Sequence, residues 1–253
     1  MKQDIFDLTG KKALITGGRR GIGAALAIGL AQKGVDIAII GQAADVGNIQ
    51  NTIEKLGQKC YYFQVDLKNR DERKNIISKI IDTLGQIDIL INNAGYQTVC
   101  SIENYSLEMW DDDIELLLTS IFDLSQQVYP FMKKNGGGKI IHIASISSFQ
   151  GARNIIGYAT AKHALVGLTK CMSNEWAKDN ININAIAPGI IESDMSKETI
   201  KNRAKADVLK GRIPSGRFGL PSDLIGPIIF LCSDASSHIH GTVIPIDGGW
   251  LGR

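Results

Sequence analysis

The sequence contains few cysteines, and none of them form the close pairs that hold a metal ion. The four cysteines lie far apart, at Cys60, Cys100, Cys171 and Cys232. Without a C-x-x-C pair a zinc site is not expected, and reduced thiols in a cytoplasmic protein are the simpler interpretation. His238 and His240 alternate in a short segment, but two histidines without a third ligand do not indicate a metal site. We therefore expect no metal.

Long apolar runs are also absent. No segment approaches the roughly 18 to 20 uninterrupted apolar residues that would span a bilayer. The first residues, MKQDIFDLTGKK, carry acidic side chains where a signal peptide needs an apolar core. The net charge of +2 is too small to indicate a nucleic-acid partner. We expect a cytoplasmic protein that acts on a small molecule and binds neither a membrane nor a nucleic acid.

The chain shows no linker, repeat or low-complexity tract, so we expect one domain over residues 1–253. Short apolar runs predict strands at residues 12–16, 35–40, 60–65, 87–92, 139–144, 181–187 and 242–247. Amphipathic stretches between them predict helices near 21–33, 48–56, 69–84, 106–134, 158–178 and 221–233. The acidic run Asp111 to Asp113 suits a first helical turn, where negative charge opposes the dipole. Strict alternation of strand and helix predicts an α/β fold, a parallel sheet wound on both faces.

The stretch TGGRRGIG, Thr16 to Gly23, predicts a nucleotide-binding loop, because a strand precedes it and a helix follows. Gly17 can adopt turn conformations that side chains forbid. Gly21 and Gly23, on either side of Ile22, would let the backbone approach a pyrophosphate and the helix pack closely on the strand. The loop has no Gly-Lys-Ser or Gly-Lys-Thr ending, so a Walker-type triphosphate site does not fit. We expect a dinucleotide.

The end of the second predicted strand helps to decide between NAD and NADP. A carboxylate there would bind the ribose hydroxyls and repel a 2′-phosphate. Gly41 and Gln42 stand at this end, so it holds neither an acid for NAD nor an arginine for NADP. Arg19 or Arg20 would reach a 2′-phosphate in one interpretation and lie near the pyrophosphate in the other. Both interpretations stay open here.

A second set of residues predicts the chemistry. Tyr158 and Lys162 are four residues apart in a helical pattern and therefore lie on one face. Ser145 ends a predicted strand, where the carboxyl ends of α/β strands open into the ligand crevice. A phenol with a pKa of about 10 is a poor base, so Lys162 is expected to lower the pKa of Tyr158, together with the charge of an oxidised nicotinamide. Ser145 would hold the oxygen of an alcohol that loses its proton to Tyr158 and a hydride to the nicotinamide.

These segments, with NNAG (92–95), YATAK (158–162) and APGIIESDM (187–195), resemble the motifs of the short-chain dehydrogenase/reductase family over nearly the whole chain. The resemblance implies a single Rossmann-like domain with seven parallel strands, and usually a homotetramer. It also implies further cofactor contacts. These are Asp66 and Leu67 near the adenine, Asn93, Ala94 and Gly95 along the crevice, and Pro188, Gly189, Ile191 and Ser193 near the nicotinamide. Tyr158 and Lys162 would also contact the cofactor.

Within the family, SFQG (148–151), NEWAKDNININAIAPG (174–189) and residues 211–231 resemble the 2-deoxy-D-gluconate 3-dehydrogenases, also described as 2-dehydro-3-deoxy-D-gluconate 5-dehydrogenases. This resemblance implies a deoxy-sugar acid as substrate and NAD as cofactor, with NADP as the alternative. Substrate contacts are expected from Ser145, Gln150 and Tyr158. The pocket would be formed mainly by residues 145–160 and 187–220.

Two features depart from the family pattern. An asparagine that supports a proton relay usually stands seven residues after the tryptophan of the fourth helix, but here that position is Leu117. The segment YQTVCS after NNAG lacks the arginines that would pair with a substrate carboxylate, which leaves Arg153, Arg212 and Arg217 as open candidates. Two other functions therefore stay open: an NADPH-dependent 3-oxoacyl reductase, and a nucleotide-binding sensor or partner subunit with weak catalysis.

Overall fold

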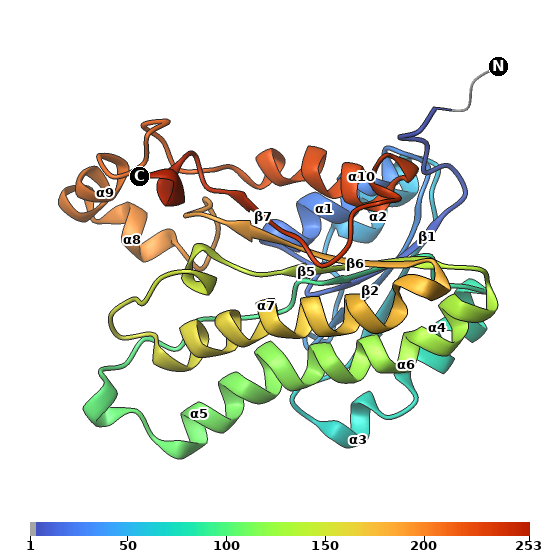
Figure 1. Cartoon of the computed structure of the whole chain (residues 1–253), viewed down its shortest axis with the longest axis horizontal. Helices are drawn as coiled ribbons and strands as arrows, with labels where there is room; N and C mark the ends of the chain where they lie inside the picture. Colours follow the sequence, from blue (N-terminus) through green and yellow to red (C-terminus); the bar gives the residue numbers. More distant parts are fainter. Residues whose placement is uncertain (1–3) are drawn as a thin grey trace.

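Within residues 4–253, seven parallel strands form one sheet in the order β3-β2-β1-β4-β5-β6-β7. The structure is a computed structural model that describes residues 4–253 (Figure 1). The strands are β1 Lys12–Thr16, β2 Asp36–Gly41, β3 Cys60–Gln64, β4 Ile89–Asn92, β5 Gly138–Ile143, β6 Ile181–Pro188 and β7 Val243–Ile246. All seven strands fall at the predicted positions, and the predicted parallel α/β fold is confirmed.

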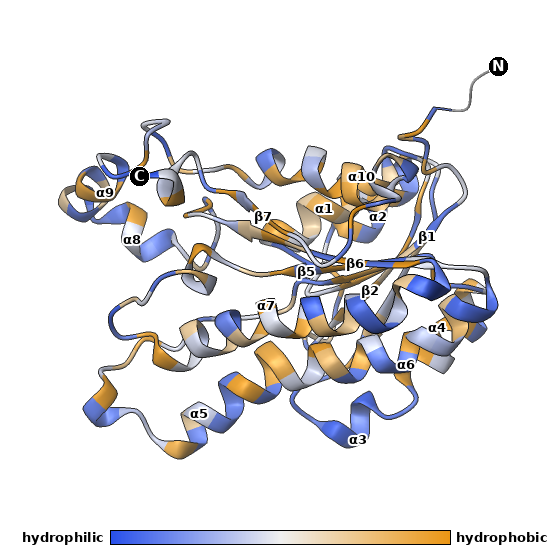
Figure 2. Ribbon diagram, in the orientation of Figure 1, coloured by the Kyte–Doolittle hydropathy of each residue, from blue (hydrophilic) through white to orange (hydrophobic). Residues whose placement is uncertain are grey.

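Helices cover both faces of the sheet, which explains the apolar strands. On one face lie α1 Gly21–Ala31, α2 Ile49–Lys55 and α10 Ile225–Cys232 (Figure 1). On the other lie α4 Ile76–Leu84, α6 Ser120–Lys134 and α7 Ile156–Trp176. Figure 2 shows apolar residues concentrated in the strands and alternating with polar ones along α6 and α7. The strands are thus buried from both sides, as parallel sheets are.

Three helical regions differ from the prediction. The single helix predicted over 69–84 is broken into α3 Arg70–Arg73 and α4, because Asn75 between them has a left-handed backbone with a φ of 61°. Two short helices, α8 Lys197–Lys201 and α9 Arg203–Lys210, have no counterpart in the prediction. Ala206 is their one buried residue, so apolar periodicity gives no signal there.

The long helix predicted near 106–134 is also divided. It consists of α5 Leu107–Ile114, a π-helical turn at Glu115–Thr119 (η2) and α6. Because α5 begins at Leu107, the prediction that Asp111 to Asp113 form the first helical turn is wrong. Asp113 is fully buried instead.

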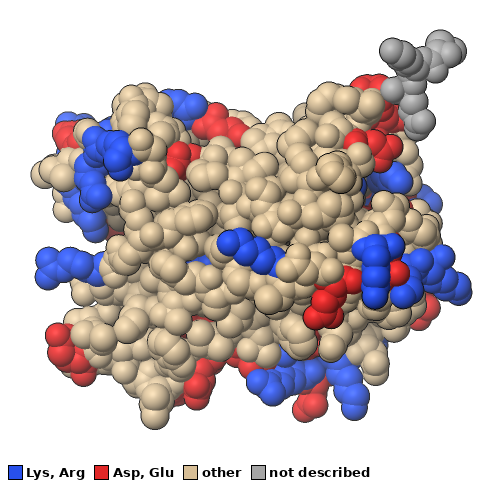
Figure 3. Space-filling model, viewed as in Figure 1, with Lys and Arg blue, Asp and Glu red and all other residues tan. Residues whose placement is uncertain are grey.

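The strand order reverses at β1, which has β2 on one side and β4 on the other. In open α/β sheets ligands bind at the carboxyl ends of the strands beside such a point. No helix in residues 4–253 has both the length and the apolar character needed to cross a bilayer. The same residues contain no group of three or more His, Cys, Asp or Glu side chains placed to hold a metal. On the face shown in Figure 3, basic and acidic side chains are interspersed.

Candidate active site

The loop between β1 and α1 has the conformation that its glycines permit. Gly17 and Gly21 have φ angles of 66° and 56°, which glycine adopts readily. A side chain on Gly23 would collide with the carbonyl oxygen of Gly17, and a β-carbon on Gly17 would lie 2.9 Å from Ala94 Cα. The close packing of this loop on the helix and on the next strand therefore requires glycine.

Helix α1 starts directly after this loop. No side chain caps its N-terminus, and no acidic residue stands in its first turn. Ile22 packs against the core, so the loop presents backbone at this position. Free N–H groups and the partial positive charge of a helix N-terminus bind phosphate. The geometry fits the pyrophosphate of a dinucleotide.

The segment after β4 lies against the glycine loop. The Thr16 hydroxyl accepts hydrogen bonds from the backbone N–H groups of Asn93 and Ala94, both at 2.9 Å. The Asn93 side chain donates to the carbonyl oxygens of Thr16 and Gly17 at 2.9 and 3.3 Å. These four bonds bring the predicted crevice residues 93–95 beside the loop.

The two adjacent arginines of the loop direct their side chains to different neighbouring segments. Arg20 forms an ion pair of 2.8 Å with Asp194, after β6. Arg19 lies 3.7 Å from Asp45, just beyond the end of β2. Because the adenosine ribose of a dinucleotide is expected at the end of β2, Arg19 is the arginine placed near its 2′ position.

A hydrogen bond joins Gln42, at the predicted ribose position, to Asp66, at the predicted adenine position. Gln42 Nε2 donates a hydrogen bond of 3.0 Å to Asp66 Oδ2. The other carboxylate oxygen of Asp66 accepts from the backbone N–H of Lys68 at 2.9 Å. Leu67 is 5% exposed and packs in the core, so its side chain faces away from solvent.

The loop after β6 reaches the glycine loop from the other side. β6 ends at Pro188, and Gly189 follows directly. Ile191 is buried. Ser193 lies close to the glycine loop, because a β-carbon on Gly21 would be 4.0 Å from Ser193 Cβ. The structure thus brings together the predicted residues of both loops.

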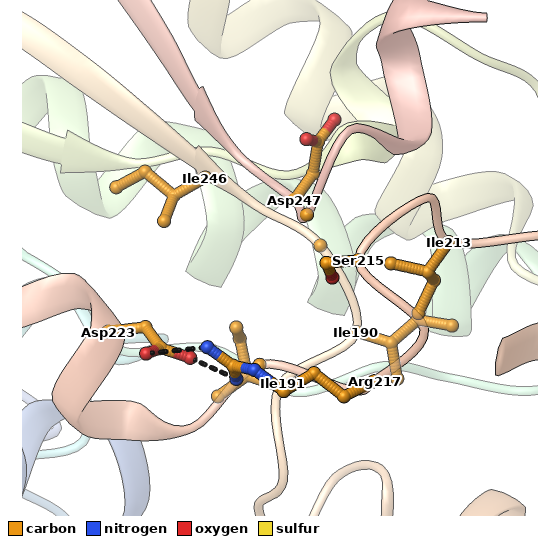
Figure 4. A pocket seen from close by; sticks show the side chains of 11 residues that line it. Ile190, Ile191, Ile213, Ser215, Arg217, Asp223, Ile246 and Asp247 are labelled. Carbon is orange, nitrogen blue, oxygen red and sulfur yellow. Dashed lines mark hydrogen bonds and ion pairs between the residues drawn. The ribbon is translucent and has the colours of Figure 1, made fainter.

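A cavity of about 210 Å³ lies behind the loop after β6 (Figure 4). Its walls come from Gly189 to Ile191, from the segment 213–219 and from Asp247 after β7. In Figure 4, Arg217 points to Asp223, with which it forms an ion pair of 2.6 Å. Ser145 and Tyr158 are not among the residues that line this cavity.

Ser145 follows β5 and begins a short 3₁₀ turn, Ile146–Ser148. Its hydroxyl oxygen accepts a hydrogen bond of 3.0 Å from the backbone N–H of Ser147. Its own N–H donates to the Ser148 hydroxyl at 3.3 Å. The bond from Ser147 leaves the hydroxyl proton of Ser145 available to a ligand.

Tyr158 and Lys162 lie on the buried face of α7, as their spacing predicts. They are 9% and 4% exposed, and Lys162 Nζ is 5.5 Å from the centre of the Tyr158 ring. Lys162 Nζ also donates a hydrogen bond of 2.6 Å to the carbonyl oxygen of Ile143, at the end of β5. This bond places the ammonium group near Ser145.

Burial is the main cause of the pKa shifts of Tyr158 and Lys162. Burial raises the pKa of Tyr158, while the Ser145 hydroxyl opposes the shift. Burial also lowers the pKa of Lys162 from 10.5 to about 8. The pKa of Tyr158 is therefore shifted upward, opposite to the lowering expected from Lys162, because desolvation of the phenolate is the largest cause of the shift.

Leu117, in place of the asparagine, lies within the π-helical turn η2. It is fully buried beside Ile155, Tyr158 and Ala161. A β-carbon on Gly95 would lie 2.9 Å from a methyl carbon of Leu117, so this side chain faces the segment after β4. The helix is distorted at this point without the asparagine, and π turns of this kind are frequent at functional sites.

A buried polar group next to Tyr158 was not predicted from the sequence. The Asp113 carboxylate accepts hydrogen bonds from Thr98 Oγ1 at 2.8 Å and from the Tyr105 hydroxyl at 2.5 Å. Burial and this carboxylate raise the pKa of Tyr105 to about 12. A β-carbon on Gly157 would lie 2.5 Å from both Asp113 and Tyr105. The signal available in the sequence is the glycine directly before Tyr158.

Gln150, predicted to bind substrate, is held by the C-terminal segment. Trp250 Nε1 donates a hydrogen bond of 2.9 Å to Gln150 Oε1. The guanidinium of Arg212 lies over the Trp250 ring, 4.3 Å from its centre. The sequence alone does not reveal this contact, because the three residues are far apart along the chain.

Comparison with known proteins identifies the family. The sequence pattern described as short chain dehydrogenase matches residues 11–204. A 2-dehydro-3-deoxy-D-gluconate 5-dehydrogenase of Escherichia coli is 41% identical, with 98% of each chain covered. A 3-oxoacyl-acyl-carrier-protein reductase of Thermotoga maritima is 36% identical over 96% of this chain and 98% of its own.

A solved structure has nearly the same fold. It is described as an NAD(P) dependent gluconate 5-dehydrogenase from Beutenbergia cavernae with bound NADP. Its TM-score is 0.95 at 36% identity, over 99% of this chain and all of that one. The present chain belongs to the short-chain dehydrogenase family, and it is an NAD(P)-dependent oxidoreductase that acts on CH–OH groups.

Proposed function

We propose that this enzyme interconverts a secondary alcohol and a ketone on a deoxy-sugar acid. The observation that carries the proposal is the burial of Tyr158 and Lys162 on one face of α7, next to the end of the strand that Ser145 follows. The sugar-acid class is supported by the name of the E. coli relative, which the chain matches over nearly its full length.

In the proposed oxidation the alcohol loses a proton and a hydride to two different acceptors. Bound NAD(P) supplies the acceptor for the hydride. Tyr158, as the phenolate, takes the hydroxyl proton, while the Ser145 hydroxyl donates a hydrogen bond to the substrate oxygen. Because the pKa of Lys162 is about 8, its side chain is charged at a lower pH than this and would stabilise the phenolate electrostatically. In the reverse direction, the neutral Tyr158 phenol returns the proton to the ketone oxygen.

The cofactor contacts are proposed from the two loops and the segment between them. The glycine loop and the N-terminus of α1 would hold the pyrophosphate, with residues 93–95 along the crevice. Gln42 and Asp66 would lie at the adenosine, and Ile191 and Ser193 at the nicotinamide. We propose NAD as the cofactor. NADP is the alternative. It is supported by the position of Arg19 and by the NADP bound in the B. cavernae structure.

We further propose a cytoplasmic homotetramer, with the substrate pocket formed mainly by residues 145–160 and 187–220. Large apolar side chains on α5 and α6 support contact between subunits. Leu107 is 82% exposed and Phe122 is 44% exposed. Subunit contact would remove both side chains from water.

Two alternatives have specific support. Reduction of a 3-oxoacyl thioester with NADPH would use the same three side chains, and a relative with that name is 36% identical. A sensor or partner subunit with weak catalysis is favoured by Leu117, which lacks an amide for a proton relay.

A substrate and cofactor screen separates the three functions. Sugar acids, neutral polyols and acyl thioesters are each assayed with both nicotinamide cofactors by the absorbance of the reduced form. The proposal predicts the highest kcat/KM for a deoxy-sugar acid. A preference for acyl thioesters supports the reductase, and tight NADH binding without turnover of any substrate supports the sensor.

A further inference from the structure

Three residues from separate segments form one stacked group near Ser145. They are Gln150, which follows the 3₁₀ turn after β5, Arg212, which follows α9, and Trp250 in the C-terminal segment. The Trp250 indole N–H bonds to the Gln150 side-chain oxygen, and the Arg212 guanidinium covers the indole ring. Each contact fixes one polar side chain against the same aromatic ring.

The tryptophan at the centre of this group is rigidly placed. Trp250 is 9% exposed and packs in an apolar cluster with Ile213 and Phe218. The Asp247 carboxylate accepts hydrogen bonds from the N–H groups of Gly249 and Leu251, at 2.8 and 2.9 Å. The indole therefore forms a fixed platform for the arginine.

The platform is joined to the proposed catalytic serine. Ile146, the residue after Ser145, packs against the same apolar cluster as Trp250. Only four residues then separate Ser145 from Gln150. Gln150 therefore lies on the same loop as Ser145, and that loop packs against the cluster of Trp250.

Of the three arginines considered from the sequence, Arg212 is the one that lies in this group, over the Trp250 ring. Within residues 4–253, Arg212 forms no ion pair, whereas Arg217 makes two hydrogen bonds to Asp223, at 2.6 and 3.1 Å. Arg153 lines a hollow against Ile156, Ala159, Thr160 and His163 of α7. That face of the helix is opposite to the face of Tyr158, because each residue advances by about 100°.

We propose that Arg212 and the side-chain amide of Gln150 bind the carboxylate of the sugar-acid substrate. The inference rests on the proposed function and names how the acid is recognised. A guanidinium presents paired N–H donors that match a carboxylate, and stacking on an indole orders it before binding. Because its oxygen accepts from Trp250, Gln150 directs its N–H groups to an acceptor such as a carboxylate oxygen.

The test compares the KM values of an acidic and a neutral substrate in variants of Arg212. For Arg212→Met we expect a KM at least about tenfold higher for the preferred sugar acid, with kcat within about threefold. The KM for a neutral polyol of the same length should be unchanged. Arg212→Lys, which keeps the charge and loses the paired donors, should fall between Arg212→Met and the wild type.

Lys79→Met, at an exposed position on α4 outside the proposed pocket, is the matched control and should leave both KM values unchanged. Calorimetric titration of the sugar acid into the enzyme with cofactor gives a readout independent of turnover, and Arg212→Met should weaken this binding by a similar factor. Equal effects on acid and neutral substrates, or no effect, would overturn the inference while leaving the proposed function intact. A wild-type enzyme that neither binds nor turns over any sugar acid would overturn both.

Discussion

His142 is a buried titratable side chain that takes no part in the proposed reaction. It is fully buried on β5, and its Nδ1 lies 3.0 Å from the Thr169 hydroxyl oxygen. That hydroxyl donates its proton to the carbonyl oxygen of Leu165 at 2.7 Å, so Nδ1 carries the hydrogen that His142 donates. Burial, and secondly the charge of Lys162, lowers the pKa of His142 from 6.5 to about 3.

This lowered pKa predicts how stability depends on pH. Since the unfolded chain binds a proton near pH 6.5 and the folded chain does not, the stabilisation from His142 is complete above pH 6.5. It is lost as the pH falls toward about 3. For His142→Asn we expect a free energy of unfolding that falls less steeply with decreasing pH, by up to about 1.4 kcal/mol per pH unit. Urea unfolding between pH 4 and 7 measures both slopes, and identical slopes would contradict the assignment.

Residues with local signals were predictable from the sequence, and residues with long-range partners were not. Gly17 and Gly21 have the positive φ angles that the loop pattern implies, and Tyr158 and Lys162 share a face because of their spacing. The partner of Gln150 lies 100 positions away at Trp250, and no local pattern encodes that distance. The burial that raises the pKa of Tyr158 was not predictable either, since desolvation depends on the packing around the residue.

At the scale of elements, the helix from α5 to α6 keeps its π turn without an asparagine. For Leu117→Asn we expect a lower melting temperature and no gain in kcat. The buried amide would lie among apolar side chains, at a cost of about 1 to 3 kcal/mol. Leu118→Asn, at the half-buried neighbouring position, should lose less stability. A rise in kcat of more than about tenfold in Leu117→Asn would show that the relay needs the amide.

The contact between α5 and α7 depends on Gly157. For Gly157→Ala we expect a loss of stability, because the new methyl group would lie 2.5 Å from Asp113 and Tyr105. The cost of such overpacking is about 1 to 3 kcal/mol. Tyr105→Phe in the same chain should recover part of the loss by removing the hydroxyl. Thermal unfolding measures both.

Gly167→Ala, on the same helix, is the control for this substitution. A β-carbon there meets nothing within 4 Å, so the change should be neutral or stabilising by up to about 1 kcal/mol. Equal melting temperatures for Gly157→Ala and the wild type would show that α5 and α7 move apart freely.

Strands were the elements most accurately predicted from sequence. β6 is apolar enough to be recognised because all eight of its residues are buried. The break at Asn75 depends on one left-handed residue, and α8 and α9 bury almost nothing, so neither has an apolar pattern to detect.

For the whole molecule, the open quantity is the number of subunits. We expect sedimentation equilibrium to give four times the chain mass of 27.5 kDa. For Phe122→Glu, which places a charge on the exposed apolar surface of α6, we expect a smaller assembly. A monomer at micromolar concentration in the wild type would refute the tetramer.

The overall topology follows from the alternation of strand and helix, because parallel strands need crossover connections that the helices supply. The positions of Arg153 and Arg212, two of the three arginine candidates, relative to α7 do not follow from it. They are set by the packing of the loop after β5 and of the C-terminal segment, which only the folded chain reveals.

The role of Tyr158 in proton transfer is tested by Tyr158→Phe, measured for both turnover and cofactor binding. We expect a loss of kcat of about a thousandfold or more, because no other group takes the proton of the alcohol. The Kd for NADH, followed by fluorescence, should stay within about threefold of the wild-type value. Turnover within tenfold of the wild type would contradict the assignment of Tyr158 as the group that exchanges a proton with the substrate.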